Sequence, residues 1–113
     1  MDTVPLAPRL RCLPAASVFG HEVRVAVGFR ARLLGLAFLQ REEAGSGLLI
    51  PRCSSVHTFG MRFPLDLFFL DERGASLAVR RLVPPRRLVS ARNAASVLEI
   101  PSPTGESSEP AES

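Results

Sequence analysis

The 113-residue sequence contains no lysine, no tryptophan and no tyrosine, and each absence narrows the range of functions. Aromatic character comes only from seven phenylalanines, which argues against a platform on which bases or sugars stack. All 14 basic residues are arginine, whose planar guanidinium suits bidentate anion contacts, although genomic base composition gives the same bias. No apolar run approaches the roughly 20 residues of a membrane-spanning helix. We therefore expect no membrane partner.

Cysteine is also scarce. Cys12 and Cys53 lie far apart and belong to no paired-ligand motif, so two free thiols are expected rather than a disulfide. The N-terminal stretch contains Arg9 and Arg11, but three prolines interrupt it, which is atypical of a secretory signal. These features predict a cytoplasmic location.

The length predicts one domain with two flanking segments. Prolines predict an irregular lead-in over residues 1–14. A β-rich domain is expected over 15–100, and a disordered acidic tail over 101–113. The tail holds three of the 11 acidic residues and no arginine, which leaves eight acids against 14 arginines in the body.

Apolar periodicity indicates the first elements of the domain. Alternation over Glu22–Val27 predicts a half-buried strand with its three valines facing inward, after a possible strand near Ser17–Phe19. Helical spacing from Phe29 predicts one main helix that ends near Gln40. Gly35 lies in the middle of that helix, and a glycine there indicates that a backbone or a bulky group packs close.

The second half of the chain is predicted to be mainly β-structure. The nearly continuous apolar run Leu65–Asp71 is typical of a central strand covered on both faces, and Asp71–Gly74 of a hairpin loop. Val89–Ala95 is expected to be a loop or short helical turn. The fold class is therefore α+β, with a small, mainly antiparallel β-sheet or partly open barrel and one main helix packed on it. Further strands are expected at 47–51, 76–82 and 96–100, and a strand or an extended segment at 55–61.

Four segments carry a family resemblance: RLLGL at 32–36, GLLIP at 47–51, HTFGMRFPLDLFFLDERG at 57–74 and VLEIP at 97–101. With them the sequence resembles the domain of unknown function 192 family of small uncharacterised bacterial and archaeal proteins. The resemblance implies a mixed fold dominated by antiparallel β-structure, and it implies no reaction. Relatives continue past the last segment with a further strand, where this chain has SPTGESSEPAES. Self-association at this shortened C-terminal edge is therefore an open alternative.

The densest run of unusual residues is SVHTFGMRFPLD, which ends at Asp66. Asp66 opens an apolar strand, where a charge needs a partner, and we expect the guanidinium of Arg32 or Arg62 to provide it. One interpretation is an ion pair that locks the fold, and the other is an arginine-lined pocket for a small polar or anionic ligand. The candidate ligand-binding residues are Arg32, His57, Met61, Arg62 and Asp66.

A hydrolytic enzyme is the alternative. His57 with Cys53 or a nearby serine would supply a base and a nucleophile, but no nucleophile elbow surrounds them. A histidine held by a backbone hydrogen bond is the simpler interpretation. Cys53 and His57 also have a spacing that a metal could use, yet a zinc site needs three or four ligands. No catalytic residue, metal or cofactor is therefore assigned.

Nucleic-acid binding is the third class considered. Arg80-Arg81 and Arg86-Arg87 flank two prolines and form a candidate basic surface. The sequence has no recognised nucleic-acid motif and no exposed aromatic ladder, so a solvated loop is the preferred interpretation. The sequence favours a binding or interaction module for a small polar or anionic ligand, or for a protein partner.

Overall fold

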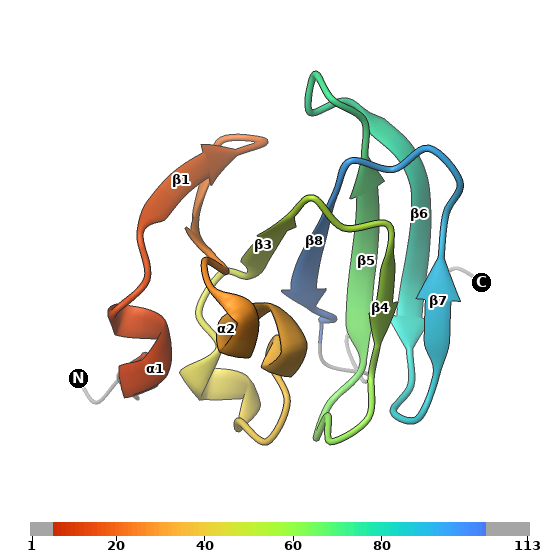
Figure 1. The fold of residues 1–113 in the computed structure, drawn as a ribbon. Coiled ribbons are helices and arrows are strands. Elements are labelled where there is room, and N and C mark those ends of the chain that lie inside the picture. Colours follow the sequence, from red (N-terminus) through yellow and green to blue (C-terminus); the bar gives the residue numbers. More distant parts are fainter. Residues whose placement is uncertain (1–5, 104–113) are drawn as a thin grey trace.

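The structure is a computed structural model that describes residues 6–103. Its main feature is a six-stranded sheet with the strand order β1-β2-β3-β8-β5-β6, next to a two-stranded sheet of β4 and β7 (Figure 1). The strands are β1 (Ala15–Val18), β2 (His21–Val25), β3 (Leu48–Pro51), β4 (Ser55–His57), β5 (Leu65–Leu70), β6 (Ser76–Val83), β7 (Leu88–Ser90) and β8 (Ser96–Pro101). The helical elements are α1 (Pro8–Arg11), α2 (Phe29–Leu34) and the 3-10 turn η1 (Arg41–Glu43).

The sheet is mixed and open. All strand pairs are antiparallel except β2 and β3, which run parallel. The last strand, β8, lies between β3 and β5, so it occupies the interior of the sheet, while β1 and β6 form its edges (Figure 1). The predominance of antiparallel β-structure is as expected, but the strands do not close into a barrel.

The expected main helix is not present. α2 has six residues and ends at Leu34, well before Gln40. Gly35 follows with φ of +55°, a left-handed conformation that ends the helix. A Cβ atom at Gly35 would lie 2.8 Å from Oε1 of Glu99, so only glycine leaves room for this carboxyl group. The prediction that a bulky group packs close to Gly35 is confirmed. The chain turns at this glycine, however, and does not continue as a helix.

The lead-in is more ordered than its prolines predict. Pro8 lies in the first turn of α1, a position where the missing backbone N–H costs nothing. Leu10 is buried in the main core, and the guanidinium of Arg9 donates to the carbonyl oxygens of Gly35 and Ala37 at 3.0 and 2.7 Å. The described part of the lead-in is therefore packed onto the domain, while residues 1–5 lie outside the described range.

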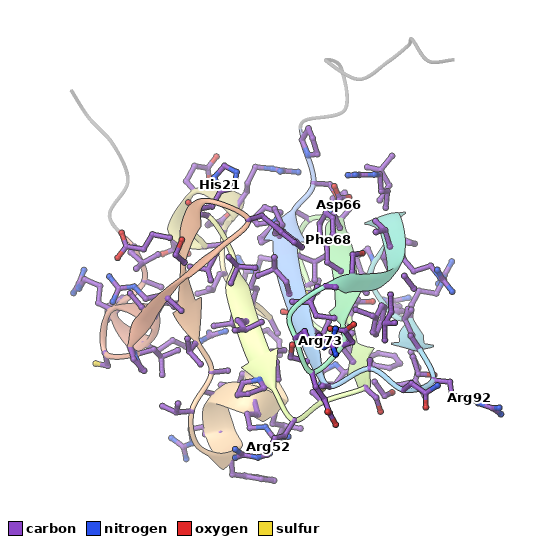
Figure 2. The ribbon with its side chains drawn as sticks, turned by 90° about the horizontal axis from the view of Figure 1, so that it is seen from above. His21, Arg52, Asp66, Phe68, Arg73 and Arg92 are labelled. Atoms are coloured by element: carbon purple, nitrogen blue, oxygen red, sulfur yellow. The ribbon has the colours of Figure 1, made fainter. Side chains whose placement is uncertain are left out.

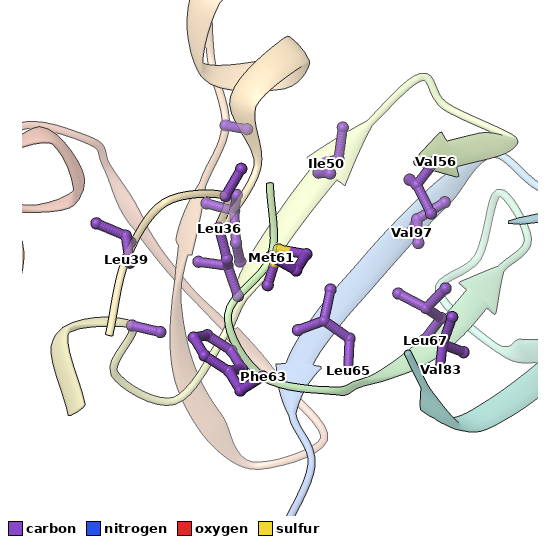
Figure 3. Close-up of a cluster of buried hydrophobic side chains, with 14 of the residues drawn as sticks. Leu36, Leu39, Ile50, Val56, Met61, Phe63, Leu65, Leu67, Val83 and Val97 are labelled. Atoms are coloured by element: carbon purple, nitrogen blue, oxygen red, sulfur yellow. The ribbon is translucent and has the colours of Figure 1, made fainter. Parts of the chain in front are cut away.

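The central strand is confirmed, since nearly every residue of β5 is buried. Leu65 and Leu67 face the main core, where Figure 3 shows them near Met61 and Val97, and Leu70 belongs to a second cluster on the other face. The Asp71–Gly74 hairpin also forms, with Gly74 donating to the Asp71 carbonyl oxygen.

Two details of the strands differ from the expectation. Val27 is exposed and not inward-facing, because β2 ends at Val25 and Ala26 takes the buried position. The expected loop after Val89 begins later, because Leu88–Ser90 pairs with β4 as strand β7. At the C-terminus, β8 continues to Pro101, and the acidic tail lies outside the described residues from position 104 onward.

Candidate functional site

The carboxylate of Asp66 is buried and fully hydrogen-bonded. Its side chain is 4% exposed, and Oδ2 accepts from Nη1 of Arg81 at 3.0 Å. Oδ1 accepts from the backbone N–H of Leu82 at 2.9 Å and from the hydroxyl of Ser102 at 2.6 Å. The Arg81 guanidinium also lies over the ring of Phe68, which Figure 2 shows close to Asp66. Every oxygen of this acid therefore has a structural partner.

The expectation that Arg32 or Arg62 pairs with Asp66 is wrong. The register between β5 and β6 shifts at Asp66, so that two residues of β6 face it across a β-bulge. In this bulge Leu82 has φ of +54°, an uncommon conformation for a branched residue. Asp66 holds the bulge in place, so the end of the SVHTFGMRFPLD segment has a role in the fold.

The rest of this segment is also tied to the fold. Thr58 is fully buried, and its hydroxyl donates to the carbonyl oxygen of Pro84 at 2.7 Å and accepts from the backbone N–H of Arg87 at 2.8 Å. Met61 lies in the main core (Figure 3), and Arg62 is exposed. These contacts fix the arginine-rich turn that precedes β7.

The five candidate residues do not share one site. Arg32 and His57 line a common cleft, and the other three do not. The cleft has a volume of about 260 Å³ and lies between α2, β3, β4 and β8. Its lining residues are Phe29, Arg32, Leu33, Leu34, Gly35, Ile50, Cys53, Ser55, Val56, His57 and Glu99.

Glu99 is the functional candidate that the sequence reasoning missed. It lies in β8 opposite Leu48 of β3 and Leu67 of β5, both fully buried, and it is itself 2% exposed. Its Oε1 atom has no hydrogen-bond partner. Burial raises the pKa of Glu99 to about 8, and a hydrogen bond from the Leu36 backbone N–H acts in the opposite direction. At neutral pH the carboxyl group is therefore protonated.

Two signals in the sequence point to Glu99. It is an acid in the apolar run Val97–Ile100, a type of position where a charge is rarely tolerated without a special environment. Two glycines also surround it: a Cβ at Gly35 would meet its carboxyl group, and a Cβ at Gly47 would lie 2.7 Å from its backbone oxygen. Neither signal identifies the acid alone, because the contacts join residues far apart in the sequence.

Arg32 is placed by α2 at the same cleft. Its Nη2 donates to the carbonyl oxygen of Arg52 at 2.7 Å, whereas its Nε is buried without a partner. Figure 2 shows Arg52 beside α2. Among buried side-chain nitrogen and oxygen atoms of residues 6–103, only Arg32 Nε and Glu99 Oε1 lack a partner. No salt bridge joins these two side chains in that part of the chain.

His57 and Cys53 also line the cleft, but both are engaged with the backbone. His57 Nε2 lies 3.0 Å from the carbonyl oxygen of Leu33, and its Nδ1 accepts from the N–H of Phe59 at 3.2 Å. These contacts assign Nδ1 as the acceptor and Nε2 as the donor. The Cys53 thiol donates to the carbonyl oxygen of Ser55 at 3.1 Å, and both cysteines of the chain are free. Within residues 6–103, no three His, Cys, Asp or Glu side chains converge as metal ligands.

Among the described residues, no helix combines the length and the apolar character needed to cross a membrane.

Comparison with known proteins gives a fold and a family. No curated protein matches the chain. A solved structure from Sinorhizobium meliloti, named "putative transcription regulator", is 20% identical with a TM-score of 0.64 and covers 78% of each chain. A protein of unknown function from Novosphingobium aromaticivorans is 19% identical with a TM-score of 0.57, over 78% of this chain and 71% of that one. At these identities the likeness shows the fold alone.

The sequence pattern is more specific than the fold. The family model of domain of unknown function 192, described as "Uncharacterized ACR", matches residues 15–109, which is most of the chain. The chain therefore belongs to the domain of unknown function 192 family.

Proposed function

We propose that this domain binds a small polar organic molecule in the cleft beside α2. The observation that carries the proposal is the pair of buried atoms without partners, Arg32 Nε and Glu99 Oε1, which line one cleft. Buried polar groups in native proteins are nearly always hydrogen-bonded, and an unmade bond costs about 1–3 kcal/mol. Two such groups in one cleft are typical of a site whose ligand supplies the missing partners.

The size and walls of the cleft support a small ligand. Its volume of about 260 Å³ is below the range of about 300–1,000 Å³ that is typical of drug-sized ligands. Apolar side chains form much of the wall, and Phe29 and Leu33 remain exposed at α2, with Phe29 80% exposed. An apolar wall with a few polar groups is the usual composition of a small-molecule site. A compact metabolite with a polar head and a short apolar part fits this description.

The hydrolase alternative has weaker support. A general base needs a free lone pair, but Nδ1 of His57 already accepts from Phe59 and Nε2 contacts Leu33. The Cys53 thiol donates to a backbone oxygen and not to the imidazole. A nucleophile and base that are already satisfied by the backbone favour a binding role over a reaction.

A metabolite screen by thermal shift, followed by methyl NMR of the cleft, tests the proposal. Ser55 lines the cleft on an exposed strand position, so Ser55→Trp is expected to fill the site. Ser76 is an exposed strand residue outside the cleft, and Ser76→Trp is the matched control. At least one compound is expected to raise the Tm of the wild type and of Ser76→Trp but not of Ser55→Trp. Compounds that act equally on both variants, or no active compound, would contradict the proposal.

A further inference from the structure

We infer that the ligand of this cleft is a monoanion with a carboxylate group, which accepts hydrogen bonds from Arg32 Nε–H and from the carboxyl group of Glu99. This inference rests on the proposed function and adds the chemical class of the ligand. Its evidence is that Arg32 Nε and Glu99 Oε1 line the same cleft, together with the hydrogen bonds that each atom can make.

Arg32 Nε–H and the carboxyl group of Glu99 are both donors, so the ligand must provide hydrogen-bond acceptors. A guanidinium has donors and no acceptor, so Arg32 Nε–H requires an oxygen or another lone pair. Glu99 is enclosed by Leu48 and Leu67 on the neighbouring strands, and no cation of the described residues pairs with it. An isolated carboxylate in such a place is far more costly than a carboxylic acid, which offers one O–H donor. The cleft therefore presents two donors to a bound molecule.

The net charge of the residues that line the cleft favours a ligand with one negative charge. Arg32 contributes one positive charge and Glu99 is protonated, while both ring nitrogens of His57 already contact the backbone. A carboxylate accepts two hydrogen bonds and compensates one guanidinium, whereas a primary amide leaves that charge uncompensated. Inorganic phosphate has more acceptor oxygens than the two donors can satisfy, and it becomes a dianion in the upper part of the pH range. The hydrocarbon part of the carboxylate would lie against Ile50 and Val56.

Butyrate, butyramide and inorganic phosphate are suitable probes, because they separate charge, shape and apolar length. Binding is followed by methyl NMR of Ile50 and Val56 between about pH 6.5 and about pH 9.5. Butyrate is expected to bind saturably and at least about tenfold more tightly than butyramide or phosphate. Above about pH 8, where Glu99 ionises, the Kd of butyrate is expected to rise by about tenfold per pH unit.

Three variants assign these effects to individual groups. Glu99→Gln keeps a donor without an ionisable proton, so butyrate should still bind and the pH dependence should disappear. Arg32→Gln should weaken butyrate binding by about tenfold or more, because a charge-assisted hydrogen bond is lost. Arg30 is exposed on the same helix and lies outside this cleft, so Arg30→Gln makes the same charge change and should leave the Kd unchanged.

The possible results separate the inference from the proposed function. Neutral molecules that shift the cleft methyl signals, in the absence of any carboxylate effect, would overturn the inference and leave the proposed function intact. Phosphate binding as tight as that of butyrate, or a Kd of butyrate that stays constant to about pH 9.5, would also overturn it. If neither anions nor neutral molecules perturb the cleft, both fail. If Arg32→Gln does not fold, the pH dependence of the Kd of butyrate for the wild type still tests the inference.

Discussion

The two buried acids of the central strands have opposite environments. Asp66 of β5 and Glu99 of β8 lie on adjacent strands, but their side chains are on opposite faces of the sheet. Asp66 has three hydrogen bonds, one of them from the ion-paired Arg81, whereas Oε1 of Glu99 has no partner. A buried acid with every partner in place stabilises a fold, and one with an unfilled oxygen is a cost that function explains better than stability.

The difference follows from position in the sheet. Asp66 faces the edge strand β6, where a bulge frees the backbone N–H of Leu82 and where Arg81 reaches from the solvent side. Glu99 lies between β3 and β5, whose backbone groups are used in the sheet hydrogen bonds. An acid can therefore be satisfied at an edge with a bulge more readily than between two regular strands.

A pH series on stability gives the largest expected difference between the two acids. Between about pH 4.5 and about pH 8, folded Glu99 holds a proton that the unfolded chain has released. The unfolded state binds fewer protons, so the free energy of unfolding should fall as pH rises, by up to about 1.4 kcal/mol per pH unit, and level off above pH 8. The total is on the order of 4–5 kcal/mol.

Urea unfolding of the wild type and of Glu99→Gln at each pH measures this contribution. The variant has no ionisable group at this position, so the difference between the two curves isolates Glu99. Parallel curves across the whole range would show that the carboxyl group titrates normally, and the contrast with Asp66 would then be lost.

Removal of the satisfied acid is expected to have the next largest effect. Asp66→Ala leaves the N–H of Leu82 and the buried hydroxyl of Ser102 without their acceptor, at a cost of about 3 kcal/mol. The strained conformation of Leu82 in the bulge also loses its support. Urea unfolding at neutral pH measures the loss. A change below about 1 kcal/mol would mean that water replaces Asp66, and that the bulge does not depend on it.

Removal of the unsatisfied acid should have the opposite sign. Glu99→Leu replaces a buried polar group by an apolar one of similar volume, which is expected to stabilise the fold by about 1–2 kcal/mol. The same substitution should abolish butyrate binding, because the O–H donor is lost. Chemical unfolding and NMR titration of one sample measure both effects. Destabilisation by Glu99→Leu would indicate that the carboxyl group contributes to the fold, as Asp66 does.

The sequence predicts the surroundings of these acids better than their partners. The family, the central strand and the hairpin follow from local patterns, and Asp66 was expected to be paired because it opens an apolar run. Its partner Arg81 lies 15 residues away across a bulge that no local pattern predicts. The site around Glu99 depends on α2, β3, β4 and β8 meeting in space. Gly35 and an acid within the apolar run at 97–100 are local signs of it. The helical periodicity, however, predicts a continuous helix where the chain turns at Gly35.

The smallest expected effect is at the ion pair itself. The side chain of Arg81 is 65% exposed, so its contact with Asp66 is screened by water, and Arg81→Gln is expected to cost at most about 1 kcal/mol. Two of the three hydrogen bonds of Asp66 remain in this variant, since Leu82 and Ser102 still donate. Urea unfolding at low and high salt measures the change, and salt should reduce the gap between variant and wild type. A loss as large as that of Asp66→Ala would instead make the guanidinium the main partner of the acid. The contrast would then come from a paired cation, which Glu99 lacks among residues 6–103.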